Sequence, residues 1–178
     1  MSTPQPNPET TALFNSAVEQ LEAAARLCKL DESQIQKREN AVSGWTVLQH
    51  LEHVTIINSL LLIRVSKLLS EPPSSEGGLN EIGISILANG QIPRGAGKSP
   101  EFALPKASSA ADVKEQADSA LSQIESLKAR LHEIEVSQSR SQHPALGTLT
   151  AREWLRFIEI HTRHHLTIIR EINGPQSL

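Results

Sequence analysis

LTAREWLRFIEIHTRHHLTIIREIN, residues 149–173, is the stretch that decides the predicted fold. Inward-facing residues recur along it at steps of four and three, which is the spacing of an α-helix that packs one face against a core. This inward stripe consists of Trp154, Ile158, His161, His165, Ile168 and Ile172. His161 and His165 are one helical turn apart on the same face, a spacing that suits two imidazoles sharing one metal ion. A buried imidazole needs either a hydrogen-bonding group or a cation as its partner.

Three more long helices are predicted upstream of this stretch. The first begins at Pro8, with Asn7 as its N-cap, and ends near residue 30. The second covers about 45–69 behind a Ser43 cap, and its body is apolar around much of its circumference. The third covers about 109–136 and carries a regular apolar stripe.

The connecting segments differ in length and composition. Polar connectors are expected at 31–43 and 137–147, whereas the segment from 70 to 108 holds most of the glycine and much of the proline. A structureless loop of that length is rare in a compact domain, so a short helix is predicted at 81–88, followed by an ordered crossing segment. Thr150 and Glu153 form a capping-box pair that starts the last helix, and Gly174 with the proline after it ends that helix.

These elements predict an all-α fold, a four-helix bundle with one long crossover between its second and third helices and no strand. Residues 1–7 are predicted to be a disordered tail, and 8–174 a single domain. The 178 residues suffice for one substantial core. Only 3% of the chain is aromatic, so that core is expected to consist mainly of Leu, Ile, Val and Ala.

Charge and hydropathy exclude several function classes. The formal charge is -3 and there is no basic cluster, so neither nucleic acid nor an anionic membrane is an expected partner. No long apolar span and no secretory signal are present, which predicts a cytoplasmic protein. The single cysteine, Cys28, lies within an apolar helical pattern and is predicted to be a packed, inert thiol.

A third metal ligand is sought on the second helix, where His50 and His53 share a face. By spacing alone the two are equal candidates. Three neutral imidazoles leave coordination positions open, as in a catalytic site, and accept zinc, nickel, copper or iron. His164 is rotated away from His165, which favours a supporting or surface role, and His143 in its His-Pro turn is expected to make a loop hydrogen bond.

The competing interpretation is a helical interaction protein without a metal. In that case neighbouring carboxylates or carbonyls would satisfy the buried histidines, and Glu52 and Glu159 are the candidates on adjacent turns. No glycine-rich phosphate loop, nucleophile elbow or paired-cysteine motif offers a different catalytic scheme.

Four motifs in order resemble the DinB/YfiT-like superfamily of metal-dependent enzymes. They are GWTVLQHLEH at 44–53, PRGAGKSPEFALP at 93–105, HPALGTLTAREW at 143–154 and HTRHH at 161–165. The resemblance implies an up-down-down-up bundle, usually a homodimer, with a three-histidine metal site. By motif position the implied ligands are His53, His161 and His165, which ranks His53 above His50.

The resemblance also implies a chemistry. Characterised relatives include thiol-dependent S-transferases and a mycothiol-dependent isomerase, so nickel or zinc is the expected metal, with a low-molecular-weight thiol as a possible second cofactor. The preferred expectation is a thiol-dependent S-transferase that acts on a small-molecule substrate. The alternatives are a metal-dependent hydrolase and a non-catalytic metal-binding or structural dimer.

Overall fold

The computed structural model describes residues 5–74, 76–95, 97 and 99–174. Residues 1–4 of the predicted tail, and the proline after Gly174, lie outside the described residues. The described chain is mostly helical, as predicted. None of its helices is both long enough and apolar enough to cross a lipid bilayer.

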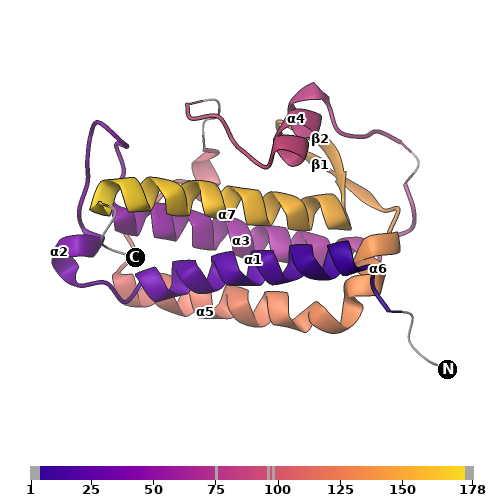
Figure 1. Ribbon diagram of the computed structural model, residues 1–178, viewed down its shortest axis with the longest axis horizontal. Helices are drawn as coiled ribbons and strands as arrows, with labels where there is room; N and C mark the ends of the chain where they lie inside the picture. The colour runs from indigo at the N-terminus through magenta and orange to yellow at the C-terminus, as the bar shows by residue number, and fades with distance from the viewer. Residues whose placement is uncertain (1–4, 75, 96, 98, 175–178) are drawn as a thin grey trace.

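The longest helices of the described chain lie side by side (Figure 1). They are α1 (Pro8–Leu27), α3 (Val47–Leu68), α5 (Ala110–Ser126) and α7 (Ala151–Asn173). α1 and α3 each pack against both α5 and α7. All six residues of the predicted stripe on α7 are buried, which confirms the amphipathic reading of that helix.

Side-chain caps explain where three of these helices start. Asn7 accepts a hydrogen bond from the Glu9 amide at the start of α1, and Thr150 forms the predicted capping box with Glu153 at the start of α7. The predicted Ser43 cap of α3 is wrong. Thr46 forms the capping box there with Gln49, and this frees the Ser43 hydroxyl for other partners.

The third predicted helix is not continuous. After α5 the chain passes through a 3₁₀ turn, η2 (Lys128–Arg130), into α6 (Leu131–Val136). Arg130 has a φ of -112° and a ψ of 16°, outside the helical region. Residues on both sides of the break remain buried, so the change of direction keeps the apolar stripe in the core.

Two connectors that were predicted to be irregular contain regular structure. A short helix, α2 (Glu32–Ile35), interrupts the first, and a hairpin of β1 (Arg140–His143) and β2 (Gly147–Thr150) forms in the second. The absence of strands was therefore a wrong prediction. At Gly147 the φ of 90° and the close approach of the Gly78 carbonyl both require glycine.

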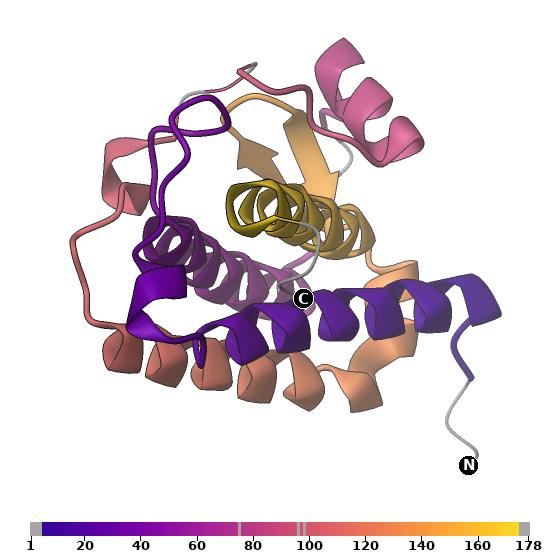
Figure 2. The same ribbon diagram turned by 60° about the vertical axis from the view of Figure 1, so that its left-hand side comes forward.

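The long crossover contains the predicted short helix, here α4 (Glu81–Asn89), and a 3₁₀ turn, η1 (Glu101–Ala103). Hydrogen bonds tie its start to the hairpin, from the Asn80 amide to the Leu146 carbonyl and from the Thr148 amide to the Gly78 carbonyl, both at 2.9 Å. Figure 2 shows α4, the hairpin and the segment that follows α4 on the side of α7 opposite α1 and α5. The crossover thus covers the contact between α3 and α7 on the side away from α1 and α5.

Candidate metal centre

Four histidines meet in the seam between α3 and α7. His50 and His53 come from α3, and His161 and His165 from α7, where i, i+3 and i, i+4 spacing puts each pair on one helical face. One ring nitrogen from each of His53, His161 and His165 lies within 4.8 Å of the other two. Tertiary packing therefore brings together the three histidines that the sequence motifs selected.

The crossover fixes the tautomer of His53. Its Nδ1 lies 2.8 Å from the carbonyl oxygen of Ala103 in η1. A carbonyl only accepts hydrogen bonds, so Nδ1 carries the proton and Nε2 presents a lone pair to the cluster. That Nε2 lies 3.3 Å from the Nε2 of His161.

His50 orients His165 and is in turn oriented by Ser43. The Nδ1 atoms of His50 and His165 are 3.0 Å apart, and the Nε2 of His50 is 2.9 Å from the Ser43 hydroxyl oxygen. When Nδ1–H of His165 donates to His50, the Nε2–H of His50 donates to Ser43. With the hydrogen bonds in this direction, Nε2 of His165 is the nitrogen available to a metal.

The ring of His161 is positioned by packing. Its centroid lies 5.6 Å from that of Phe157 and 4.7 Å from that of His165. Its Nδ1 is buried and has no hydrogen-bond partner within the described part of the chain. The polar contact of His161 is thus made by Nε2 alone, on the side of the cluster.

Trp45 covers the cluster from outside. Its ring centroid lies 5.3 Å from that of His50, 5.2 Å from that of His53 and 6.4 Å from that of His165, with the last pair stacked. An open cavity of about 500 Å³ adjoins this cover, and its lining includes Ser43, Trp45, His50 and Leu104. A small molecule therefore has room beside the cluster, next to His50.

Burial keeps the imidazoles neutral. It is the main cause that lowers the pKa of His161 and of His165 well below the usual 6.5, and neighbouring histidines lower both further. Burial also lowers the pKa of His53, although the bond to Ala103 opposes the shift. The pKa of His50 falls to about 4, through burial first and then through the charges of His53, His164 and Arg94. Neutral rings are the form that binds metals.

The facing nitrogens of His53 and His161 have the separation that two ligands of one divalent ion require. Two nitrogens bound at about 2.0–2.1 Å to one tetrahedral ion are about 3.3 Å apart, and the Nε2 atoms of His53 and His161 have this separation. Each of the outer nitrogens of His53 and His165 has a protein partner, as is usual for histidine ligands. The donor set, three neutral imidazoles, suits zinc or nickel.

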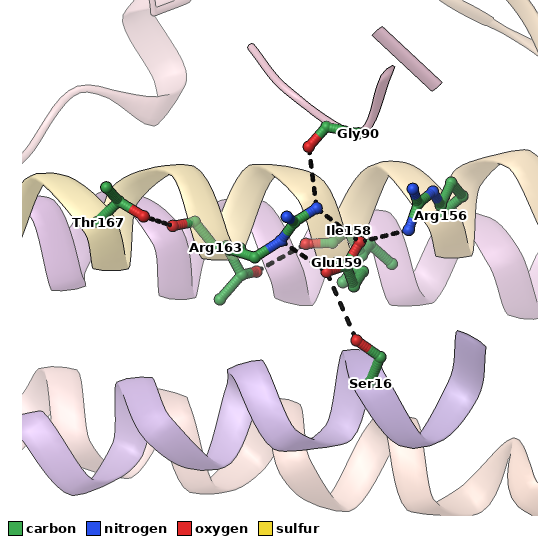
Figure 3. A network of polar contacts seen from close by, with 8 residues as sticks. Ser16, Gly90, Arg156, Ile158, Glu159, Arg163 and Thr167 are labelled. Atoms are coloured by element: carbon green, nitrogen blue, oxygen red, sulfur yellow. Dashed lines mark hydrogen bonds and ion pairs between the residues drawn. The ribbon is translucent and has the colours of Figure 1, made fainter. Parts of the chain in front are cut away.

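The carboxylates proposed as alternative partners of the histidines have other roles. The Oε1 of Glu52 accepts hydrogen bonds from the amides of Lys106 and Ser108 and from the Ser108 hydroxyl. Glu159 is paired with two arginines, as Figure 3 shows. The specific pairings of the competing interpretation are therefore wrong.

Three other sequence predictions concern residues outside the cluster. His143 makes a loop hydrogen bond as predicted, with its Nδ1 accepting from the Ala145 amide at 3.0 Å. His164 is half-buried outside the cluster, with its ring 5.3 Å from that of His165 and perpendicular to it. Cys28 is buried as predicted, and burial raises the pKa of its thiol to about 11.

Sequence reasoning missed the residues that hold the histidines. It ranked His50 as a rival ligand, whereas the structure places His50 behind His165 as its hydrogen-bond partner. Ser43 was predicted to be a helix cap. The carbonyl of Ala103 could not be predicted as a partner, because every residue has a backbone carbonyl. Such contacts join segments that are far apart in the chain, so no local sequence pattern predicts them.

Comparison with known proteins identifies a family for the chain. A protein-family model described as the DinB superfamily matches residues 9–169. No curated protein matches the chain, and no solved structure does. The matched range includes all four histidines of the seam and the segments that orient them.

Proposed function

The chain belongs to the DinB superfamily, and from this premise we propose that it is a metal-dependent enzyme. Its divalent ion, nickel or zinc, is held by His53, His161 and His165. The preferred reaction is a thiol-dependent S-transfer to a small-molecule electrophile. The proposal includes the up-down-down-up bundle topology, a homodimeric assembly and a cytoplasmic location.

One observation carries the proposal. Two neutral imidazoles face each other through Nε2 atoms 3.3 Å apart, and the partner of one of them, Ala103, fixes a lone pair on that side. A third neutral ring lies within reach. The nitrogens of three neutral imidazoles brought together in a buried seam are the donor set of a metal site with open coordination positions.

The protein's own residues would orient and shield the reacting groups. When bound, an ion at this site lowers the pKa of a thiol or water and polarises an acceptor group. Ala103 fixes the tautomer of His53, and His50 holds the ring of His165 by its Nδ1. Trp45 limits access of water to one side of the cluster, and the cavity beside it gives a small substrate a route to the site.

The ligand assignment is tested by elemental analysis of protein purified without a metal-affinity tag. Wild type should carry about one ion per chain, whereas His53→Ala, His161→Ala and His165→Ala should each lose most of it. His132→Ala, a histidine on α6 outside the cluster, is the matched control and should retain the metal. A wild-type protein that cannot be loaded with nickel or zinc would overturn the proposal.

The reaction type is tested by turnover of electrophilic small molecules by metal-loaded protein, with and without a low-molecular-weight thiol. A transferase requires the thiol, and the variants that lose metal should be inactive. Turnover of esters or amides without a thiol would favour hydrolysis, which the same site could support with water as the nucleophile. A loaded protein without turnover in either assay would favour a non-catalytic metal-binding dimer.

A further inference from the structure

A second cavity lies on the outer face of α7, and its lining shares no residue with that of the cavity beside Trp45. It has a volume of about 320 Å³ and lies between α7 and the segment that follows α4. Six of its lining residues matter here: Gly90, Arg94, Arg163, His164, Arg170 and Glu171. None of them takes part in the metal site as described above.

The lining is basic although the formal charge of the chain is -3. Three arginines and one glutamate line the cavity, which gives it an excess of positive charge. Arg94 is paired with Glu171 at 2.6 Å, with both side chains nearly half exposed. Arg170 has no ion-pair or hydrogen-bond partner for its guanidinium among the described residues, so its donors are available to a ligand.

One wall of the cavity is rigidly built. Arg163 donates through Nε to Oε1 of Glu159 at 2.8 Å and through its terminal nitrogen to the Gly90 carbonyl at 2.9 Å (Figure 3). Glu159 is only 3% exposed and also accepts a hydrogen bond from Arg156. The arginine therefore ties the end of α4 to α7 and keeps the two sides of the cavity at a fixed separation.

The cavity and the metal centre share a wall. His164 lines the cavity, and its ring packs edge-on against that of His165 with centroids 5.3 Å apart. Arg94, on the opposite wall, acts electrostatically on both His164 and His50. A group bound in the cavity would thus lie one side chain away from a metal-binding histidine.

We propose that this cavity binds an oxyanion, a carboxylate or phosphate group, through Arg94 and Arg170, and that the small molecule acted on at the metal centre carries this group. Guanidinium groups suit both oxyanions because their planar donors match the acceptor oxygens. The identification of the anion with part of the substrate rests on the proposed function. Binding of the anion itself does not.

The test is calorimetric titration of the full chain with inorganic phosphate and, separately, with succinate, at low ionic strength. Each protein is titrated both metal-loaded and after treatment with a chelator. Binding at one site per chain by at least one of the two anions, retained after chelation, is the expected result. The anion that binds more tightly identifies which of the two groups the ligand carries.

Charge variants of opposite sign make the test specific. Arg170→Gln should weaken binding about tenfold, since a charge-assisted contact contributes roughly that factor. Glu171→Gln should tighten it several-fold, because it removes a negative charge and releases Arg94. Arg64→Gln, an exposed arginine on α3 without a partner in the described chain, makes the same charge change as Arg170→Gln and should leave the affinity within about twofold.

Several results would overturn the inference. They are no binding of either anion in the millimolar range, equal weakening by Arg64→Gln and Arg170→Gln, and loss of binding on chelation, which would place the anion on the metal. Metal content of the same samples reports on the proposed function separately. Protein that cannot be loaded with nickel or zinc but binds phosphate through Arg170 would contradict the enzyme proposal alone, and metal-loaded protein without anion affinity would contradict this inference alone.

Discussion

The Nδ1 atoms of His50 and His165 lie 3.0 Å apart, so one ring of α3 holds one ring of α7 by its outer nitrogen. Since two nitrogens at this distance share a single proton, the hydrogen bond to His50 holds the His165 ring in one rotation. His50 is therefore a positioning residue for His165, one of the proposed metal ligands. It also joins the Ser43 turn to the cluster.

Loss of this hydrogen bond should weaken metal binding without unfolding the chain. His50→Leu should lower the affinity for zinc by about 10- to 100-fold, the usual effect of removing a partner of a histidine ligand. Competition against a chromophoric chelator measures the change, and His132→Leu is the matched control. An unchanged affinity for His50→Leu would show that packing alone positions His165.

The buried histidines should make the metal-free protein sensitive to mild acid. The unfolded chain binds protons near pH 6.5, whereas the pKa of His50 and that of His143 are about 4 in the folded chain. Full stability is therefore present above pH 6.5 and is lost as the pH falls toward 4, by up to about 1.4 kcal/mol per pH unit for each histidine.

Urea unfolding of chelator-treated protein between pH 6.5 and 5 tests this, because most carboxylates do not titrate there. His161 and His165, whose pKa values are also lowered by burial, should steepen the dependence of the free energy of unfolding on pH. His143→Gln should reduce by about one the number of protons taken up on unfolding, which makes the dependence of the free energy of unfolding on pH shallower. A free energy of unfolding that is independent of pH over this window would contradict the prediction.

Glu52 should stabilise the crossover segment next to the metal centre. Its Oε1 accepts from the Ser108 hydroxyl at 2.6 Å and from the Lys106 amide at 2.9 Å, and the side chain is only 1% exposed. Glu52→Ala leaves these donors unpaired and should lower the free energy of unfolding by about 2 kcal/mol or more. Ser108→Ala removes only one of the contacts, so its effect should be smaller.

The Glu52 variant should also affect the cluster. The Ala103 carbonyl that fixes His53 lies three residues before Lys106, so a loosened crossover weakens control of that ring. Limited proteolysis should cut the segment between η1 and α5 faster in Glu52→Ala than in wild type. Zinc affinity should fall with it, and equal cleavage rates would show that Glu52 does not anchor the segment.

Arg163 should matter more for stability than its neighbour Arg156. Arg163 bonds both oxygens of the buried Glu159 and the Gly90 carbonyl, whereas Arg156 makes one of the hydrogen bonds to this carboxylate. Arg163→Ala should lower the free energy of unfolding by about 2 kcal/mol, and Arg156→Ala by about half as much. Equal losses in urea titrations of the two variants would show that the additional bonds of Arg163, to the second oxygen of Glu159 and to the Gly90 carbonyl, add nothing.

Much of the fold follows from local patterns. The stripe on α7, the Asn7 cap of α1 and the pairing of Thr150 with Glu153 each depend on residues within a few positions of one another, and each is present as predicted. The break at Arg130 and the hairpin at 140–150 were missed. No proline or glycine marks the break, and the hairpin strands are short and polar, so neither leaves a clear periodic signal.

The sequence by itself determined which residues face inward on α3 and α7, because helical periodicity places His53, His161 and His165 on apolar faces whatever lies opposite. Only the tertiary structure decided that these faces meet, and that Nδ1 of His50 lies against Nδ1 of His165. It also decided which nitrogen of His53 points into the cluster, through a carbonyl 50 positions away in the chain. The physical reason is that hydrogen-bond partners and ring orientations depend on contacts between distant segments, which spacing along one helix cannot specify.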